Sequence, residues 1–218
     1  MKIELKKHVL HANNELAAEL RLKYKENKVY CINMISSPGS GKTSLLEKTI
    51  PMLDGYKMAV VEGDVLTERD AQRIRKTGIP AIQIETSGAC HLDAPMIQNA
   101  IADLDMPSEG FLFVENVGNL VCPTSYDLGE AAKVVVISVT EGDDKPGKYP
   151  AIFMNAAVCV LNKTDLLPYI PFNLQSFYDD VKSVNSNMEI IEVSCQTGEG
   201  LEAWKAWLEK RRNEFLAQ

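Results

Sequence analysis

One eight-residue segment constrains this chain more than any other feature. Residues 36–43 read SSPGSGKT, after an apolar run at 29–35 and before a helical pattern at about 43–53. Small residues in such a loop let backbone N–H groups surround a phosphate at a helix N-terminus. Ser36 stands where this pattern usually has glycine, which a serine can replace if its φ stays negative. We therefore predict a Walker A loop whose nucleotide-binding residues are Ser37, Pro38, Gly39, Ser40, Gly41, Lys42, Thr43 and Ser44.

The rest of the chain alternates short apolar runs with helical patterns. Strands that are apolar throughout and separated by helices are typical of a parallel sheet covered on both faces. The predicted strands are 29–35, 58–61, 81–84, 111–114, 134–139, 157–161 and 190–193, and the predicted helices are 43–53, 67–76, 92–104, 149–155, 174–185 and 201–216. We therefore predict an α/β P-loop NTPase domain at residues 27–218, with a mostly parallel sheet flanked by helices.

Residues 1–26 are predicted to form a separate N-terminal amphipathic helix that packs on this domain. Between about residues 3 and 24, apolar side chains recur at helical spacing between polar ones. They are Leu5, Val9, Ala12, Leu16 and Leu20.

Composition limits the partners of the chain. Its 218 residues include 23 Lys and Arg against 30 Asp and Glu, which gives a net charge of −7. Without a basic block, nucleic acid and anionic membranes are poor candidates for partners. No apolar stretch reaches the roughly 18 residues that a membrane span needs, and the N-terminus lacks a signal-peptide core. Five scattered cysteines, an odd number, indicate reduced thiols and a cytoplasmic protein.

A second motif predicts which base is bound. Asn162-Lys163-Thr164-Asp165 follows the apolar run at 157–161, as in the Asn-Lys-x-Asp guanine motif. The Asp165 carboxylate can accept from guanine N1–H and from the exocyclic amine, whereas adenine offers no such pair of donors. Ser194-Cys195-Gln196 resembles the companion loop that supports guanine O6. An ordinary polar turn at residues 162–165 is the alternative, but the preceding Walker A loop makes GTP and GDP the expected ligands.

Two carboxylates follow apolar strands at the sheet edge where ligands bind. Glu115 is predicted to hold Mg²⁺ together with the Thr43 hydroxyl, and Asp64 to reach the metal or orient the attacking water. Lys42 would contact the β- and γ-phosphates, so Lys42, Asp64 and Glu115 are the predicted catalytic residues. Either carboxylate could instead cap the next helix. Because no glutamine follows Gly118, slow intrinsic hydrolysis is expected.

Thiols and an imidazole form a third candidate site. Cys90 and His91 stand together at a loop-to-helix junction, and Cys122 follows Glu115 by a few residues. Thiolate and neutral imidazole are ligands that select Zn²⁺ and also suit Ni²⁺. The spacing is not that of a zinc finger, so buried thiols beside a helix-capping histidine remain the alternative, and the sequence alone does not bring residues 90 and 122 together. Cys31 and Cys159 lie inside apolar strands and are predicted to be core.

Taken together, the motifs resemble the HypB family, the hydrogenase-maturation GTPases that help insert nickel into [NiFe]-hydrogenase. The similarity runs from about residue 5 to the end of the chain. The motifs that carry it are SSPGSGKT at 36–43, EGD at 62–64, GACHLDA at 88–94, FVENVGNLVCP at 113–123, SVTEGDDKP at 138–146 and NKTD at 162–165. The run from Glu115 to Pro123 is far more specific than the Walker A loop.

The resemblance implies a GTP-dependent nickel metallochaperone that dimerises around nucleotide. Cys90, His91 and Cys122 match the family's metal-site positions at the dimer interface, where Ni²⁺ or Zn²⁺ is expected. Lys148 matches a lysine that approaches nucleotide from the other subunit, and Leu166-Leu167 lies where a dimer contact is expected. The implied partners are a second copy of the chain, a nickel-delivery protein and the hydrogenase large subunit.

Several departures and alternatives stay open. The sequence has neither the N-terminal Cys-rich motif nor the His-rich stretch of some members, so nickel storage is not expected, and Ala89 replaces a residue that is commonly basic or Gly. A urease-type nickel-insertion GTPase is one alternative, although the Cys-Pro-His motif of that family is missing. A kinase would need an acceptor site besides the same loop. A non-catalytic metal-binding module would use nucleotide only as a structural ligand.

Overall fold

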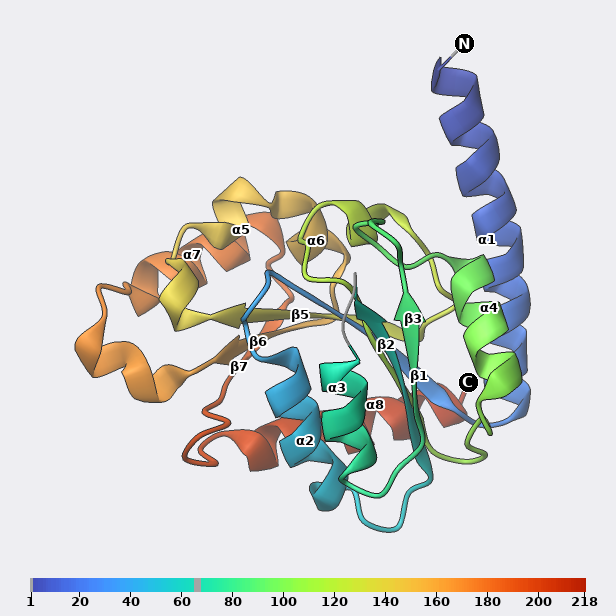
Figure 1. The fold of residues 1–218 in the computed structure, drawn as a ribbon. Coiled ribbons are helices and arrows are strands. Elements are labelled where there is room, and N and C mark those ends of the chain that lie inside the picture. Colours follow the sequence, from blue (N-terminus) through green and yellow to red (C-terminus); the bar gives the residue numbers. More distant parts are fainter. Residues whose placement is uncertain (1, 65–67) are drawn as a thin grey trace.

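A sheet of seven parallel strands forms the centre of the molecule (Figure 1). The computed structural model describes residues 2–64 and 68–218. The strand order is β3-β2-β4-β1-β5-β6-β7, so the first strand lies in the middle of the sheet. The strands are β1 (Tyr30–Ser36), β2 (Met58–Asp64), β3 (Ala81–Glu85), β4 (Phe111–Glu115), β5 (Ala132–Ser138), β6 (Val158–Asn162) and β7 (Glu189–Glu192). The predicted α/β fold with a parallel sheet is confirmed.

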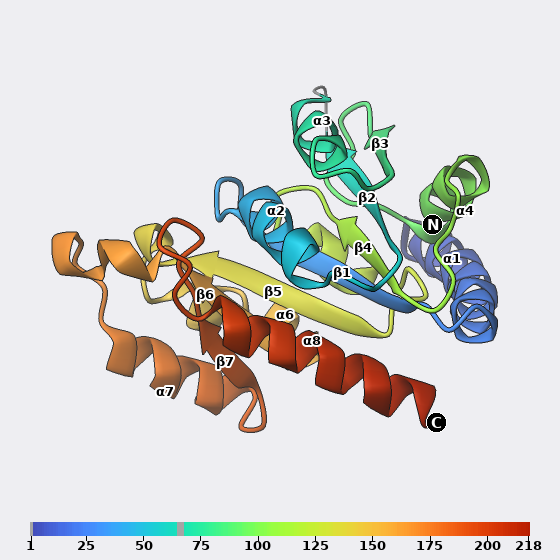
Figure 2. The same cartoon turned by 90° about the horizontal axis from the view of Figure 1, so that it is seen from below.

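Helices cover both faces of the sheet (Figure 2). One face packs against α2 (Lys42–Met52), α3 (Arg69–Arg75) and α8 (Leu201–Leu216). The other packs against α1 (Lys2–Glu26), α4 (Ala94–Asp103), α6 (Pro150–Asn155) and α7 (Leu174–Val184). The short helices are α5 (Lys145–Lys148) and the 3-10 turns η1 (Cys122–Ser125), η2 (Val139–Glu141) and η3 (Thr164–Tyr169). In the described part of the chain, no helix combines the length and apolarity that crossing a membrane requires.

The predicted elements are present, with shifts at their ends that have physical causes. The helix predicted at 92–104 begins only at Ala94, because the Asp93 carboxylate accepts from the Met96 N–H at 2.9 Å and so caps it. The strand predicted at 58–61 continues to Asp64, since Glu62 pairs in register with Glu115 of β4. The predicted start of the next helix, Thr67, lies outside the described residues.

The N-terminal helix packs on the body through a stripe that agrees with the predicted one at Leu16 and Leu20 but not nearer the N-terminus. Val9 and Ala12 were expected on the packed face but are exposed, and the side chain of Leu5 lies outside the described part. The buried residues of this stripe are Asn13, Ala17, Tyr24 and the predicted Leu20. Asn13 occupies this stripe because its Oδ1 accepts from the Ala94 N–H at 2.8 Å. Its Nδ2 donates to the Asp127 carbonyl at 2.9 Å.

Candidate nucleotide site and thiol–imidazole cluster

The Walker A loop connects the central strand β1 to helix α2. Gly39 and Gly41 have φ of 78° and 99°, which glycine adopts without strain. A Cβ at Gly41 would lie 2.4 Å from Asn162 Nδ2, so this glycine is also required by close packing. Ser36 stays in the extended strand, and its hydroxyl accepts from Lys42 Nζ at 2.7 Å. The serine therefore fits the place that usually holds glycine, as expected.

A cavity of about 500 Å³ opens beside this loop at the carboxyl ends of β1, β2 and β4. It is lined by backbone of the loop and by charged side chains of both signs. These residues are Pro38, Gly39, Gly41, Lys42, Thr43, Ser44, Glu62, Gly63, Asp64, Asp70, Arg73, Glu115, Asn116, Val117, Gly118 and Lys163. The structure thus brings the predicted Lys42, Thr43, Asp64 and Glu115 together around one space.

Two buried carboxyl groups face each other in this cavity. Glu115 Oε1 accepts from the Thr43 hydroxyl at 2.9 Å and lies 3.8 Å from Lys42 Nζ. Within the described residues, Glu62 Oε1 and Glu115 Oε2 are buried without a hydrogen-bond partner. Burial first, and then the neighbouring Glu115, raises the pKa of Glu62. Burial also raises the pKa of Glu115, against the opposing effect of Lys42. The unpartnered oxygens are where a cation would bind.

Sequence reasoning missed Glu62 and Arg73. Glu62 could have been found, because it continues the two-residue spacing of Met58 and Val60 along β2. Arg73 donates to Glu47 at 2.6 Å and to the Ser44 hydroxyl at 3.1 Å, so it braces the start of α2 from α3. No local pattern around Arg73 marks this role.

The guanine-type motif lines a second cavity of about 530 Å³. This cavity shares Gly41, Ser44 and Lys163 with the first, so the two are adjacent. Its other lining residues are Glu47, Lys48, Asn162, Asp165, Leu166, Cys195 and Gln196. A phosphate chain and a base can therefore occupy neighbouring spaces.

The same motif braces the Walker A loop. Asn162 Nδ2 donates to the Ser40 carbonyl at 2.9 Å, and Lys163 Nζ donates to the Gly39 carbonyl at 2.7 Å. Asp165 Oδ1 accepts from the Ser194 hydroxyl at 2.6 Å. Residues more than a hundred positions apart are thus locked into one unit.

Four predicted nucleotide-site residues line neither cavity, namely Ser37, Ser40, Ser194 and Lys148. The Ser40 hydroxyl contacts the Ser37 carbonyl and the Glu141 carboxylate, so only the backbone of Ser40 is available to a ligand. Lys148 is exposed on α5 and paired with Asp144, and it lines neither cavity of its own chain.

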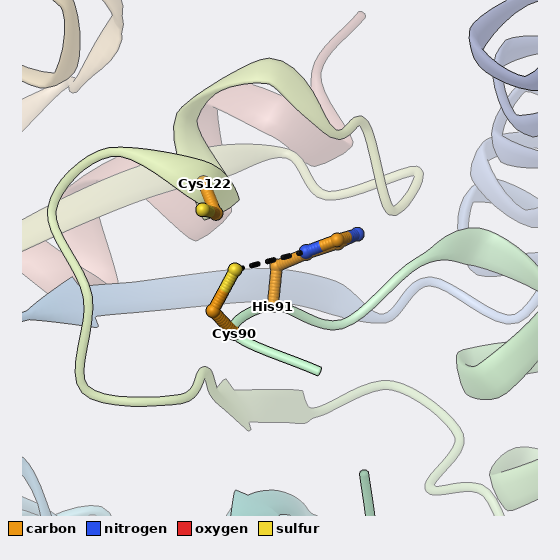
Figure 3. A group of neighbouring side chains, drawn as sticks. All are labelled: Cys90, His91 and Cys122. Atoms are coloured by element: carbon orange, nitrogen blue, oxygen red, sulfur yellow. Dashed lines mark hydrogen bonds between the residues drawn. The ribbon is translucent and has the colours of Figure 1, made fainter. Parts of the chain in front are cut away.

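Cys90, His91 and Cys122 lie close together, with Cys90 and His91 on the loop before α4 and Cys122 at the start of η1 (Figure 3). One potential ligand atom from each residue lies within 4.8 Å of the others, and Cys90 Sγ is 3.7 Å from His91 Nδ1. All three are half-buried, and Asp93 rather than His91 caps α4, so the predicted alternative is wrong for the capping histidine. Partial burial lowers the pKa of His91, which favours the neutral imidazole that metals bind.

Neighbouring residues fix the shape of this cluster. The ring of Tyr126 stacks on His91 with centroids 3.8 Å apart, a contact that no sequence pattern predicted. Asn119 Oδ1 accepts from the backbone N–H groups of Val121 and Cys122 at 2.7 and 3.2 Å. Cys31 and Cys159, in contrast, are fully buried in their strands as predicted.

A Walker A loop that leaves the central strand of a parallel sheet, beside a cavity lined by Lys42 and Thr43, defines a P-loop nucleotide-binding protein. Residues 31–192 match the family described as CobW/HypB/UreG, nucleotide-binding domain. The hydrogenase maturation factor HypB of Azotobacter vinelandii is 49% identical over 215 residues, which cover 98% of this chain and 71% of that protein. The chain therefore belongs to the HypB family of hydrogenase maturation factors.

Two further relatives support this assignment. The hydrogenase/urease maturation factor HypB of Helicobacter hepaticus is 42% identical over 214 residues, covering 96% of this chain and 88% of its own. The crystal structure of Helicobacter pylori HypB in complex with nickel superposes with a TM-score of 0.89 at 41% identity. The superposition covers 93% of this chain and 96% of the Helicobacter pylori chain.

Proposed function

We propose that this chain is a GTP-hydrolysing nickel chaperone for [NiFe]-hydrogenase maturation, which couples GTP binding and dimerisation to the binding and release of metal. One observation carries the proposal. The segment from Glu115 to Cys122 begins in the first cavity, the nucleotide cavity beside the Walker A loop, and ends in the thiol–imidazole cluster of Cys90, His91 and Cys122. A ligand contact at one end of so short a segment can displace a metal ligand at the other.

The two adjacent cavities support GTP as the nucleotide. Backbone N–H groups of residue 37 and residues 39–44 would hold the phosphates. The Lys42 ammonium group would move away from Ser36 and Glu115 and neutralise the phosphate charge. Asn162, Lys163, Asp165 and the loop of Ser194, Cys195 and Gln196 would surround the base. The carboxylate of Asp165 selects guanine because guanine alone offers it two adjacent donors.

Hydrolysis in this proposal depends on positioning more than on covalent chemistry. Thr43, Asp64 and Glu115 would hold Mg²⁺, which supplies charge neutralisation between the phosphates when bound. The unpartnered oxygens of Glu62 and Glu115 fit such a cation. Asp64 lines the same cavity and would orient the attacking water. Because no glutamine follows Gly118, we expect slow intrinsic turnover to GDP.

The cargo site is the cluster of Cys90, His91 and Cys122. Three protein ligands leave one position of a four-coordinate ion open, which suits transfer better than permanent retention. Ni²⁺ and Zn²⁺ both accept this ligand set. In a homodimer the open position is available to the second copy, and Lys148 would reach the nucleotide of the partner. The nickel-delivery protein and the hydrogenase large subunit are the proposed partners.

Urease is a second candidate recipient of the metal. The name of the Helicobacter hepaticus relative covers both hydrogenase and urease maturation, so the family resemblance alone does not choose between the two enzymes. Complementation of strains that lack either maturation activity separates them. We expect the chain to restore hydrogenase activity; restored urease activity alone would replace hydrogenase as the recipient.

The coupling is tested by titrating the protein with Ni²⁺ and Zn²⁺ in the presence of Mg²⁺ and either GDP or a GTP analogue. We expect metal affinities to differ by about 5- to 150-fold between the two states, the usual range of allosteric coupling. The matching ATP analogue is the control and should have no effect. Identical affinities in both guanine-nucleotide states would refute the coupling. Unchanged metal release by Asp64→Ala would favour a non-catalytic module.

A further inference from the structure

Asn116 stands between the nucleotide cavity and the thiol–imidazole cluster. It follows Glu115 at the end of β4, lines the nucleotide cavity and is only 1% exposed. Its backbone N–H donates to the Met34 carbonyl of β1 at 3.0 Å. The main chain of Asn116 is therefore fixed to the sheet, so movement around it has to occur in the loops that its side chain holds.

One oxygen of Asn116 holds both loops of the cluster. Its Oδ1 accepts from the Leu92 N–H at 3.1 Å and from the Val117 N–H at 3.0 Å. Leu92 directly follows His91, and Val117 begins the segment that ends at Cys122. The two segments that supply the cluster are thus joined at a single acceptor atom.

Buried hydrogen bonds on the side away from the loops fix the orientation of the Asn116 amide. Asn116 Nδ2 donates to Asn33 Oδ1 at 3.1 Å, and Asn33 Nδ2 donates to Glu130 Oε1 at 3.3 Å. All three side chains are buried. A rotated Asn116 amide would place its NH₂ group against the N–H groups of Leu92 and Val117, so the chain of contacts keeps Oδ1 toward the loops.

Close packing connects the same two loops to the nucleotide cavity. A Cβ at Gly118 would lie 3.0 Å from Pro38 Cα, so the segment after Asn116 passes directly over the Walker A loop. A Cβ at Gly63 would lie 2.8 Å from the Leu92 side chain, so Leu92 packs against the end of β2. A displacement at Pro38 or Gly118 therefore reaches Val117 within one residue.

We propose that Asn116 is a positioning residue that transmits nucleotide state to the metal cluster. The proposal rests on the proposed function, in which metal affinity depends on nucleotide. A nucleotide that displaces Val117 and Gly118 changes the hydrogen bond from Val117 to Asn116 Oδ1. Because the N–H of Leu92 shares that oxygen, His91 shifts relative to Cys122, and the affinity of the cluster for metal changes.

Asn13→Ala is a matched control for Asn116→Ala. Asn13 is 3% exposed, and its Oδ1 also holds the loop of His91, through the Ala94 N–H at 2.8 Å. It does so from α1 rather than from the end of β4. A general loosening of the loop would affect both variants alike, whereas a loss of transmission through Asn116 would affect Asn116→Ala alone.

The experiment measures the dissociation constant for Ni²⁺ with Mg²⁺ and either GDP or a GTP analogue, in wild type and both variants. We expect the ratio of the two constants to fall to within about twofold of one in Asn116→Ala and to stay at the wild-type value in Asn13→Ala. A wild-type ratio in Asn116→Ala, or an equal loss in both variants, overturns the proposal. A ratio of one in the wild type itself refutes the proposed function instead.

A measurement on the unmodified protein covers the case in which Asn116→Ala does not fold. In metal-free wild type, we expect the amide resonances of Leu92 and Val117 to shift together when the GTP analogue and Mg²⁺ are added to the GDP-bound form. The amide of Ala94, which Asn13 holds, should shift less. A Leu92 resonance that stays in place while that of Val117 moves overturns the proposal.

Discussion

The nucleotide cavity and the thiol–imidazole cluster are held in place in different ways. In the two adjacent nucleotide cavities, three predicted nucleotide-binding side chains already have partners at short distance: Lys42 contacts Ser36, Lys163 the Gly39 carbonyl, and Asp165 the Ser194 hydroxyl. The cluster consists of half-buried side chains from two loops. Preorganised groups lose little freedom when a ligand binds, whereas a site assembled from loops is altered by small displacements. The cavity is thus suited to constant recognition and the cluster to variable affinity.

Asp165→Asn should produce the largest effect and should be confined to the cavity. Asparagine keeps an oxygen for Ser194 but presents an NH₂ group to the guanine amine, so two donors face each other. We expect GTP affinity to fall about 10³-fold, or about 4 kcal/mol, and xanthosine triphosphate to bind better than GTP. Competition binding with both nucleotides measures the reversal.

The metal affinity of nucleotide-free Asp165→Asn should remain that of the wild type. A change in nickel affinity without nucleotide would break the division between a braced cavity and a separate cluster. Unaltered preference for GTP would show that the base lies elsewhere than beside Asp165.

Cys122→Ala should have the next largest effect, this time confined to the cluster. Removing one of three ligands should weaken Ni²⁺ binding at least about 100-fold, since even residues that only orient ligands are worth 10- to 100-fold. Isothermal titration with Ni²⁺ measures this loss. Cys195→Ala is the control, because Cys195 is also half-buried but lines the second cavity, beside the guanine-type motif. Equal losses in the two variants would mean that nickel binds wherever an accessible thiol is found.

The sequence predicted the cavity more completely than the cluster, for a physical reason. Each cavity residue that the sequence predicted belongs to a short motif at the end of a strand, and the carboxyl ends of parallel strands meet at one edge. Lys42 and Asp165 could therefore be placed before the fold was known. The meeting of Cys90 with Cys122 depends on how two loops leave that edge, and local spacing does not encode their path. Family resemblance was needed to join them.

Buried polar side chains were the main omission. Asn13 and Asn116 are buried and hydrogen-bonded to groups distant along the chain, and Glu62 is buried opposite Glu115 of β4. Periodicity places polar residues on the surface, so it assigned Ala12 rather than Asn13 to the packed face of α1. Only the tertiary contact with the Ala94 N–H explains the difference.

Asn119→Ala should weaken the cluster more mildly and equally in every nucleotide state. Asn119 Oδ1 accepts from the N–H groups of Val121 and Cys122, two and three residues further along the same turn. We expect a loss of nickel affinity of about 10-fold, typical of a group that orients a ligand. Titrations in GDP and in the GTP analogue should give the same loss. A loss limited to one nucleotide state would show that this turn also transmits the signal.

Glu62→Gln should have the smallest effect. This substitution replaces a buried carboxyl group in the nucleotide cavity. Burial and the neighbouring Glu115 raise the pKa of Glu62, so the folded chain holds its proton more tightly than the unfolded chain, where the pKa is about 4.3. The contribution of Glu62 to stability is then fully present below about pH 4.3 and is lost as pH rises through the raised pKa. Glutamine has the shape of the protonated acid and does not titrate.

At pH 8, in the absence of nucleotide and metal, Glu62→Gln should therefore be more stable than the wild type by at least about 1 kcal/mol, the value of roughly one pKa unit. The difference should shrink toward pH 5, because the unfolded wild-type chain gains less free energy from releasing this proton as the pH approaches its own pKa. Urea unfolding at both pH values measures it, with the exposed Glu202→Gln as control. A less stable variant at pH 8 would mean that Glu62 is ionised and paired with Lys42. The cavity would then offer a cation two ionised carboxylates, Glu62 and Glu115, instead of one, and both would be charged before the cation binds.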